Sequence, residues 1–552
     1  MSMNWLEGMP PQMGGPMAEQ MGSPMAKPVF AGQKLVVVGG SSGMGRQTAA
    51  DVVAAGGSAV VIGLDEGRVN DAAADLSRNG KAYGITADLT NRMEVERVRQ
   101  QLADEHADAT LLVNAAGVFV PKPFLDHDAT DYDSYLELDR AIFFITQTVA
   151  RGMVSQARGG SIVTIGSMWA HQAIGATPSS AYSLGKAGLH ALTRNLALEL
   201  APHQIRVNAV APAVFVQTDN TAGNAIVAYT RTASGGLRQA GSYPTAGNGG
   251  ATNGSVVDHL SSQGSLAYDR RAGLLYAVNA GSNTITVFRV LGDELFRSQV
   301  ISSGGQFPVS ITFHGSRVFV LNAWGGASIA GFLQLGGYLI PVPRWTRDLG
   351  LGTSSSTIFT GTPGQVGFTP GGSQLVVTTK NAANTVDVFA NGPSGPSGQP
   401  TVTSLPGTIP FGFTFDRYGH LALVETGAGA VATFAIASDG TLSQLGSAAT
   451  GQAATCWITA APEGTLYASN AGSGTESTLA TEPDGAITQL GVTPADAGTT
   501  DATVSSDGQY LYVQAGGPGN VDAYRIGPGG ALTETGSVTV PGAVGGEGIA
   551  AS

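Results

Sequence analysis

The pattern of apolar and polar positions changes near residue 213. Before it, short apolar runs alternate with longer stretches of helical spacing; after it, many short strand-like segments are separated by turns of Gly, Asn, Ser and Asp. Strands alternating with helices are typical of a parallel sheet, whereas evenly spaced short strands are typical of a closed all-β fold. We therefore predict a multidomain chain: a leader over 1–29, an α/β Rossmann-type doubly wound domain over 30–213 and an all-β domain over 214–552.

Six apolar runs predict the strands of the parallel sheet: Lys34–Val38, Ser58–Ile62, Ala82–Thr86, Thr110–Val113, Ser161–Ile165 and Arg206–Val210. Helical patterns lie between them, including Arg46–Ala55 and Ala181–Leu200. In a doubly wound sheet, ligands bind at the carboxyl ends of the strands. Small and polar residues follow the predicted strands at these ends, which makes this edge the place to look for chemistry.

A glycine-rich turn follows the first predicted strand, and its sequence is Gly39-Gly-Ser41-Ser42-Gly43-Met44-Gly45. Glycines here permit a tight turn and let a pyrophosphate approach the backbone N–H groups at the start of a helix. Turns of small residues are common after strands, so the indication depends on the other strand ends. These carry Asp88-Leu89, Asn114-Ala115-Ala-Gly117, Gly166-Ser167 and Ala211-Pro212.

Three residues of the same domain indicate acid/base chemistry: Ser167, Tyr182 and Lys186. Tyr182 and Lys186 are four residues apart within a predicted helix, so they share one face. A nearby ammonium lowers the pKa of a phenol, and such a tyrosine exchanges a proton with a hydroxyl or carbonyl oxygen. Ser167 is able to hydrogen-bond the same oxygen. A Tyr-x-x-x-Lys pair on its own is usually a surface pair; the series of strand ends favours the catalytic interpretation.

In the order and spacing of these motifs, residues 30–213 resemble the short-chain dehydrogenase/reductase family. The resemblance implies hydride transfer between NAD or NADP and a small-molecule carbonyl or alcohol. It implies Tyr182 as the acid/base, Ser167 as the group that orients the oxygen, and Lys186 as the residue that holds the nicotinamide ribose. It implies a cofactor site made by Gly39, Ser41, Ser42, Gly43, Met44, Gly45, Asp65, Asp88, Leu89, Asn114, Ala115, Gly117, Tyr182, Lys186 and Pro212.

The chain departs from the family pattern in three places. Where many members carry a relay asparagine, this chain has Leu138-Asp139-Arg140. Leu64 holds the position that usually discriminates the cofactor, and the adjacent Asp65 would repel a 2′-phosphate, which favours NAD weakly. The family pattern stops near Val214, so the segment that covers the substrate and a seventh strand are missing unless the second domain supplies them. Trp169, His171, Gln172 and Ile174 are either substrate-pocket residues or ordinary loop packing.

Related strand–turn–strand units recur after residue 213. They start near Val214, Leu274, Arg317, Gln374, His420, Thr465 and Gln509. Seven units of this kind predict a seven-bladed β-propeller. Its closure would pair Glu547–Ala551 with Val214–Gln217. In its turn and strand pattern this region resembles the lactonase-type, phosphogluconolactonase-like propellers.

Polar residues near the presumed innermost strands are candidates for a propeller site: Asp258, His259, Gln263, Gln365, Cys456, Asp501 and Glu547. A lactonase needs a base, for which His259 or Glu547 is suitable, whereas structural rim residues would look the same. An alternative function therefore places the activity in the propeller, as a lactone hydrolase or sugar-binding module, with the first domain a truncated, inactive scaffold. Cys456 beside Trp457 is expected to be a small buried residue.

Composition excludes several classes of protein. The formal net charge of −12 argues against nucleic acid as a partner, and no apolar run is long enough for a membrane helix. The single cysteine excludes an intrachain disulfide and a multi-cysteine zinc site, and no metal site is predicted. Residues 1–29 hold seven of the 11 methionines and read as a disordered leader, a soft-metal site being the alternative. We expect a cytoplasmic protein that forms a homo-oligomer, if any, through its dehydrogenase-like domain.

Overall fold

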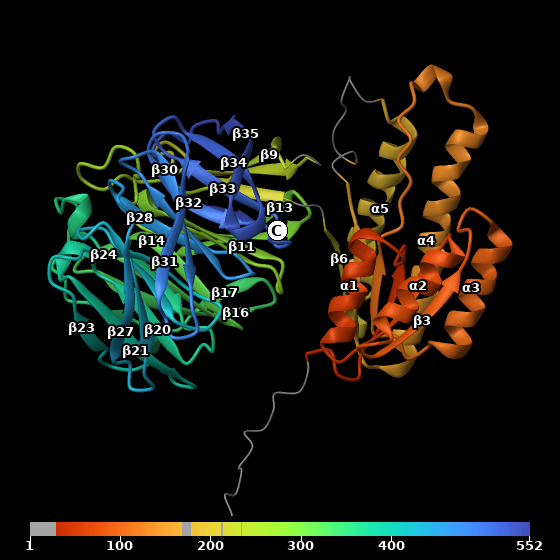
Figure 1. Cartoon of the computed structure of the whole chain (residues 1–552), viewed down its shortest axis with the longest axis horizontal. Helices are drawn as coiled ribbons and strands as arrows, with labels where there is room; N and C mark the ends of the chain where they lie inside the picture. The colour runs from red at the N-terminus through yellow and green to blue at the C-terminus, as the bar shows by residue number, and fades with distance from the viewer. Residues whose placement is uncertain (1–28, 168–169, 171–177, 211–212, 233–234) are drawn as a thin grey trace, which may run out of the picture. The chain divides into compact units, whose positions relative to one another are not determined.

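A computed structural model describes residues 29–167, 170, 178–210, 213–232 and 235–552 (Figure 1). The predictions made for the leader, for Trp169, His171, Gln172 and Ile174, and for Pro212 lie outside the described residues. The described chain contains one parallel sheet with its helices and one set of antiparallel sheets. Each of these two parts is described by itself.

The first part is a six-stranded parallel sheet in the order β3-β2-β1-β4-β5-β6. Its strands are β1 (Lys34–Val38), β2 (Ser58–Gly63), β3 (Lys81–Thr86), β4 (Leu111–Asn114), β5 (Gly160–Ile165) and β6 (Ile205–Val210). Its helices are α1 (Gly43–Ala54), α2 (Glu66–Leu76), α3 (Arg92–Glu105), α4 (Ala129–Gln156) and α5 (Ser180–Glu199). All six predicted strands are confirmed, with ends that differ by about one residue.

The strand β1 lies at the centre of this sheet. Val36 is in parallel register with Val60 of β2 on one side and with Leu112 of β4 on the other. Strands covered on both faces read as continuous apolar runs, and the Val36–Val38 side chains are fully buried. The order of the strands reverses between β1 and β4, which is the point where open α/β sheets bind ligands.

The sheet ends at β6 within the described residues. The next strand along the chain, β7 (Ala213–Gln217), pairs with propeller strands instead. The expected loss of a seventh parallel strand is therefore seen in the strand order. No helix of the described residues combines the length and hydropathy that crossing a membrane requires.

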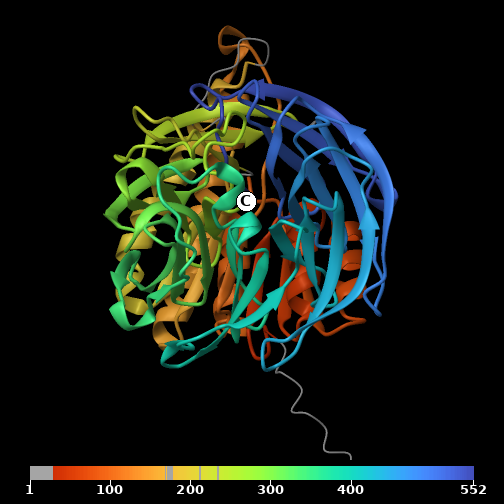
Figure 2. The ribbon, with the colours of Figure 1, turned by 90° about the vertical axis from the view of Figure 1, so that its left-hand side faces the viewer.

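The second part is a propeller of seven sheets, whose ring is visible in Figure 2. The first sheet contains β36 (Ile549–Ala551), β7, β8 (Ala225–Arg231) and β9 (Leu237–Pro244). The second and third contain β10 (Leu266–Asp269), β11 (Leu274–Asn279), β12 (Thr284–Leu291) and β13 (Glu294–Ser302), then β14 (Gln306–His314), β15 (Arg317–Trp324), β16 (Ser328–Leu335), β17 (Tyr338–Pro341) and β18 (Arg347–Asp348).

The remaining four sheets follow in chain order. The fourth and fifth contain β19 (Gln365–Phe368), β20 (Gln374–Thr378), β21 (Thr385–Gly392), β22 (Gly395–Pro396) and β23 (Thr401–Ser404), then β24 (Pro410–Phe415), β25 (Leu421–Glu425), β26 (Ala430–Ile436) and β27 (Leu442–Ala449). The sixth and seventh contain β28 (Thr455–Ala460), β29 (Thr465–Asn470), β30 (Thr475–Thr481) and β31 (Ile487–Pro494), then β32 (Thr499–Val504), β33 (Tyr510–Ala515), β34 (Asn520–Ile526) and β35 (Leu532–Thr539).

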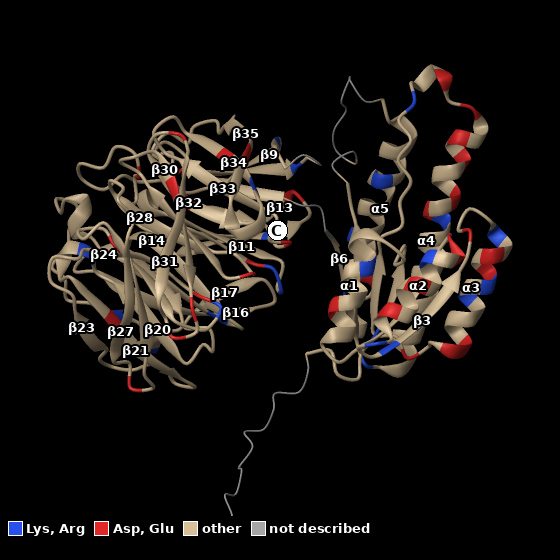
Figure 3. Cartoon of the chain, viewed as in Figure 1, with Lys and Arg blue, Asp and Glu red and all other residues tan. Residues whose placement is uncertain are grey.

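The repeat units found in the sequence correspond to the second strand of each sheet, which is β7, β11, β15, β20, β25, β29 and β33. These strands are buried along nearly their whole length, which explains their strong apolar signal. Charged side chains are frequent on the helices of the first part and sparse on the propeller strands (Figure 3). The prediction of seven blades is confirmed.

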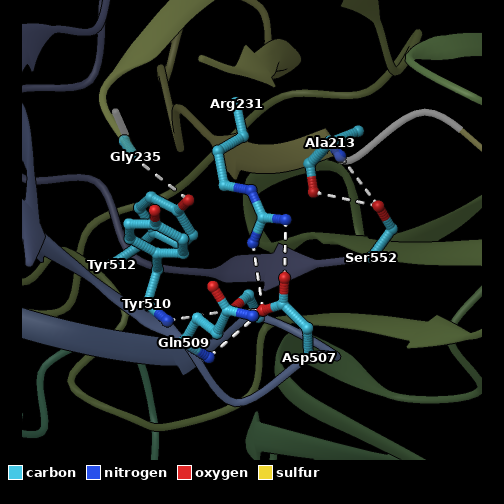
Figure 4. A network of polar contacts seen from close by, with 9 residues as sticks. Ala213, Arg231, Gly235, Asp507, Gln509, Tyr510, Tyr512 and Ser552 are labelled. Atoms are coloured by element: carbon cyan, nitrogen blue, oxygen red, sulfur yellow. Dashed lines mark hydrogen bonds and ion pairs between the residues drawn. The ribbon is translucent and has the colours of Figure 1, made fainter. Parts of the chain in front are cut away.

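The ring is closed by the end of the chain, as predicted. Strand β36 is antiparallel to β7, with Ile549 opposite Val216. Beyond this pair, the backbone N–H of Ala213 donates to the Ser552 hydroxyl at 2.8 Å (Figure 4). The Arg231 guanidinium of β8 reaches Asp507, in the turn between β32 and β33, with two hydrogen bonds of 3.0 and 2.6 Å. Residues of the first and seventh sheets thus hold the closure together.

Candidate functional site

The glycine-rich turn is closely packed at its base and open at its tip. Gly39 has a φ of +82°, and a Cβ there would lie 2.5 Å from the backbone nitrogen of Ala116. A Cβ on Gly45 would lie 2.3 Å from the carbonyl oxygen of Gly39. Gly43 also has a positive φ, of +53°, but nothing lies within 4 Å of its Cβ position. The N-cap residue Ser42 makes no side-chain hydrogen bond, so no capping side chain satisfies the first N–H groups of α1.

The other predicted cofactor residues in and after this turn differ in their exposure and local contacts. Met44 is exposed, while Ser41 lies against the end of β2, with its hydroxyl 2.7 Å from the Cβ position of Gly63. Asp65 is the N-cap of α2, because its carboxylate accepts a hydrogen bond of 2.8 Å from the Arg68 backbone N–H. Asp65 therefore caps α2, and a ribose hydroxyl would share its carboxylate with the Arg68 backbone N–H.

Asp88 and Leu89 follow β3. One oxygen of Asp88 accepts hydrogen bonds from the backbone N–H and the hydroxyl of Thr90, at 2.9 and 2.7 Å. Glu94 accepts from the Asp88 backbone N–H, and Leu89 is buried. The strand end is thus held by its own turn, with Asp88 half-buried at the surface.

Asn114 ends β4 and is buried. Its amide donates a hydrogen bond of 2.9 Å to the Thr146 hydroxyl of α4, while its Oδ1 has no hydrogen-bond partner among the described residues. The next residue, Ala115, donates its backbone N–H to Val38 of β1 at 2.8 Å, and Gly117 is exposed. The predicted Asn-Ala-Ala-Gly motif therefore lies directly beside the glycine-rich turn.

Ser167 follows β5 and is half-buried. A Cβ on the preceding residue, Gly166, would lie 2.4 Å from Nε2 of His190, so the imidazole of α5 packs on the strand end and leaves room for a glycine only. This contact fixes the backbone just before Ser167 against α5.

Tyr182 and Lys186 lie one turn apart on α5, as predicted. The Lys186 ammonium donates a hydrogen bond of 3.1 Å to the carbonyl oxygen of Ile165, the last residue of β5. It also lies 5.7 Å from the centre of the Tyr182 ring. The helix therefore brings the phenol and the ammonium together at the carboxyl end of β5, where Ser167 follows two residues later.

Two aromatic residues packed on Tyr182 were not singled out from the sequence. The Phe119 ring lies 4.8 Å from the Tyr182 ring, and the Tyr135 ring of α4 lies 6.0 Å from it, measured between centroids. The only signal for Phe119 was its position two residues after the Asn-Ala-Ala-Gly motif, and Tyr135 carried none.

The interior of the propeller holds a buried cluster of carboxyl groups. Glu547 has no exposed surface, and its carboxyl oxygens accept hydrogen bonds from the Ser262 hydroxyl. Burial raises the pKa of Glu547 well above its usual value, and the charge of Asp258 raises it further. Burial likewise raises the pKa of Asp219 to about 8 and that of Asp501 to about 7. These carboxyl groups are protonated more readily in the folded state than in water.

Lys380, the only lysine of the propeller, lies in the same interior. Its ammonium donates to the hydroxyls of Ser261 and Thr362 at 2.8 and 3.0 Å, and burial lowers its pKa to about 7. No role was assigned to this lysine from the sequence. These hydrogen bonds join the segment that precedes β10, which contains Ser261, to the segment that precedes β19, which contains Thr362.

The segment that precedes β10 also contacts β28. The Gln263 amide donates to the carbonyl oxygen of Ile458, at 2.7 Å, and accepts from its N–H, at 3.0 Å, while the Trp457 indole donates to the carbonyl oxygen of Ser262, at 2.6 Å. Gln365 accepts from the Phe413 backbone. The side chains of Gln263 and Gln365 thus link segments that are distant in the sequence.

Two further propeller candidates have local surroundings of their own. Cys456 is buried, as expected, and burial raises the pKa of its thiol to about 12, which disfavours a nucleophilic thiolate. His259 is half-buried and packs on Gly545, whose Cβ position is 2.2 Å from its Nε2. In the part of the chain that the structure describes, no group of three or more His, Cys, Asp or Glu residues is arranged to hold a metal ion.

Comparison with known proteins matches the two parts of the chain to different family models. The lactonase seven-bladed β-propeller model matches residues 418–547. A structure from Bacteroides uniformis that is classed as a 6-phosphogluconolactonase is 20% identical, with a TM-score of 0.51, and the match covers 62% of this chain and 99% of that one. At this identity the likeness shows the propeller fold alone.

The short chain dehydrogenase model matches residues 33–225. Galactitol 2-dehydrogenase of Rhizobium johnstonii is 35% identical over 193 residues, which are 34% of this chain and 73% of that protein. L-xylulose reductase of Mesocricetus auratus is 33% identical over 187 residues, or 34% of this chain and 72% of that protein. The chain, which also carries a seven-bladed propeller, belongs to the short-chain dehydrogenase family.

Proposed function

We propose that the chain is an oxidoreductase that transfers a hydride between a nicotinamide cofactor and a small carbonyl or alcohol substrate. The observation that carries the proposal is the position of Tyr182 and Lys186 on α5, with the ammonium bound to the last residue of β5 and 5.7 Å from the phenol ring. The names of the relatives, galactitol 2-dehydrogenase and L-xylulose reductase, belong to the same class of reaction.

The residues at the other strand ends fit a dinucleotide. The turn at Gly39 and Gly45 allows no side chain, and its open tip at Gly43 leads into the uncapped start of α1. Backbone N–H groups in this arrangement suit a pyrophosphate. The buried Asn114 Oδ1, which lacks a partner among the described residues, is an acceptor ready for a ligand donor. Gly39, Ser41, Ser42, Gly43, Met44, Gly45, Asp65, Asp88, Leu89, Asn114, Ala115, Gly117, Lys186 and Pro212 would line the cofactor.

A bound nicotinamide supplies or accepts the hydride, and the residues of the chain handle the proton. In carbonyl reduction, Tyr182 donates its phenolic proton to the oxygen as the carbon receives the hydride; in alcohol oxidation it accepts the proton. The Lys186 ammonium stabilises the phenolate that remains, because opposite charges at short range favour the ionised form. The Ser167 hydroxyl hydrogen-bonds the reacting oxygen and orients it.

Of the two nicotinamide cofactors, NAD is the one that we propose. Leu64 is exposed after β2 and offers no charge to a 2′-phosphate, and the neighbouring Asp65 carboxylate would repel one. One oxygen of the Asp65 carboxylate already accepts a hydrogen bond from the Arg68 backbone N–H. The other oxygen is the one that would bind a ribose hydroxyl.

The alternative, a hydrolytic propeller with an inactive first domain, has less support. Glu547, one of the two candidate bases, is completely buried and hydrogen-bonded to Ser262. A general base must come within hydrogen-bond reach of its substrate. The other candidate base, His259, is half-buried and packs on Gly545. The dehydrogenase part, which brings a phenol and an ammonium together, is the better candidate for the chemistry.

The test is a titration of the purified full chain with NADH and with NADPH, followed by nicotinamide fluorescence. Saturable binding of one or both is expected, with NADH the tighter. Absence of binding by either cofactor would overturn the proposal. Hydrolysis of lactones by a variant lacking the Tyr182 hydroxyl would instead favour the propeller.

A further inference from the structure

An exposed apolar segment follows the Asn-Ala-Ala-Gly motif. Val118, Phe119 and Val120 have 41%, 45% and 60% of their surface exposed. Isolated apolar side chains on a surface need no explanation, but three consecutive ones next to Tyr182 do. Their side chains contain no hydrogen-bond donor or acceptor.

This segment is held in place by specific contacts. The Tyr135 hydroxyl accepts from the Val120 backbone N–H and donates to the Val120 carbonyl oxygen, both at 3.0 Å. The backbone N–H of Lys122 donates to Pro178 at 3.0 Å, and the Lys122 ammonium pairs with Asp131 of α4. The exposure of the three apolar side chains is therefore not the result of a loose loop.

The segment is also in contact with the proposed acid/base. The Phe119 ring packs at 4.8 Å and 59° to the Tyr182 ring, and the buried Tyr135 ring packs edge-on against Tyr182. A substrate oxygen that receives a proton from Tyr182 must lie about 2.6–3.2 Å from its hydroxyl. The groups attached to the carbonyl carbon then lie beside Phe119, because they are only a few bonds from that oxygen.

We propose that Val118, Phe119 and Val120 form one wall of the substrate site, and that the substrate carries an alkyl or aryl group on the side facing this wall. The inference rests on the proposed role of Tyr182. The preferred substrate is therefore an apolar ketone or secondary alcohol and not a polyol. A polyol would leave hydroxyl groups against side chains that cannot bond them, and unpaired polar groups are strongly selected against in binding.

The test compares an alkyl ketone with a ketose of equal carbon number, using the full chain and its bound cofactor. The wild-type protein is expected to favour the alkyl ketone in kcat/KM. Phe119→Ser is expected to lower kcat/KM for the alkyl ketone about 10–100-fold, mainly through KM, while Phe119→Leu keeps most of it. Phe124→Ser, at a side chain that is 75% exposed in the same stretch, is the matched control and is expected to have no effect.

Cofactor affinity, measured by nicotinamide fluorescence, separates this inference from the proposed function. If the cofactor binds and the ketose is preferred, or Phe119→Ser leaves the alkyl ketone unaffected, the apolar wall is wrong and the proposed function stands. If neither the alkyl ketone nor the ketose is turned over, quenching of bound NADH fluorescence by the alkyl ketone is the readout. Quenching lost in Phe119→Ser supports the wall, and no quenching in the wild type overturns it. If neither cofactor binds, the proposed function fails first.

Discussion

The Lys186 ammonium lies 5.7 Å from the centre of the Tyr182 ring and donates to the carbonyl oxygen of Ile165. Lys186 lies one helical turn after Tyr182, and its ammonium thus lies between the phenol ring and the end of β5. The family assignment rests on sequence; this relationship is the geometric reason to place the proton chemistry on α5. It also sets the most direct expectations for variants.

Replacing Lys186 is expected to change the pH dependence of the reaction. Lys186→Met removes the charge that stabilises the Tyr182 phenolate, so more alkaline conditions are needed to form it. The rising limb of the pH profile for alcohol oxidation is expected to move up by about one pH unit or more. Lys81→Met, on the exposed surface of β3, is the control. A profile that is unchanged in Lys186→Met would argue against the coupling.

The glycine-rich turn allows a test that separates steric packing from backbone strain. Gly39→Ala combines a positive φ with a Cβ at 2.5 Å from Ala116, and is expected to cost about 3 kcal/mol of unfolding free energy. Gly32→Ala has a similar φ, of +76°, with nothing within 4 Å, and is expected to cost about 1 kcal/mol. Differential scanning calorimetry measures both costs, in the unfolding transition that added cofactor shifts in the wild-type protein. Equal costs would contradict the close packing.

The ring closure of the propeller depends on the Arg231–Asp507 pair. Burial alone would raise the pKa of Asp507, but hydrogen bonds from Arg231 and Ser505 outweigh it and lower the pKa. The guanidinium also stacks 4.8 Å from the Tyr510 ring. In urea unfolding, a double-mutant cycle of Arg231→Gln and Asp507→Asn is expected to give a coupling of about 1–2 kcal/mol. A coupling near zero would show that the closure does not use this pair.

The buried carboxyl groups predict a pH effect on propeller stability. Asp219 has a pKa raised to about 8 by burial, so the folded state holds a proton that the unfolded chain releases near pH 4. Its stabilisation is present below about pH 4 and is lost as the pH rises towards 8, by up to about 1.4 kcal/mol per pH unit.

The variant Asp219→Asn tests this effect, because asparagine mimics the protonated carboxyl group. Between pH 4 and 7 the variant is expected to gain stability relative to the wild type as the pH rises. This window avoids Lys380, whose lowered pKa of about 7 makes the folded state gain stability above that pH. Asp484→Asn, in an exposed turn, is the control. Parallel pH curves for Asp219→Asn and the wild type would contradict a protonated Asp219.

Local sequence was sufficient for the elements with a strong apolar period. The strand β1 was predicted to the residue, because Leu35–Val38 form an unbroken buried run flanked by glycine. The second strand of each blade was visible for the same reason. Turn residues at the strand ends located Asn114 and Ser167, and the four-residue spacing within a helical pattern located the Tyr182–Lys186 pair.

Contacts between distant segments were beyond local pattern. The hydrogen bonds between Gln263 and Ile458 join segments 195 residues apart, and nothing in either segment signals its partner. The packing of Phe119 on Tyr182 is of the same kind. The capping of α2 by Asp65 was missed because a carboxylate after a strand is equally suited to capping and to ribose binding.

The most direct measurement of the central claim compares turnover and cofactor affinity in Tyr182→Phe and the wild type. The substitution removes only the hydroxyl, so packing against Phe119 and the position of Lys186 are kept. We expect kcat for carbonyl reduction to fall about 100-fold or more, with the Kd for NADH within about twofold of the wild type. Tyr132→Phe, on an exposed part of α4, is the control. Undiminished turnover in Tyr182→Phe would contradict the assignment of the proton transfer to this residue.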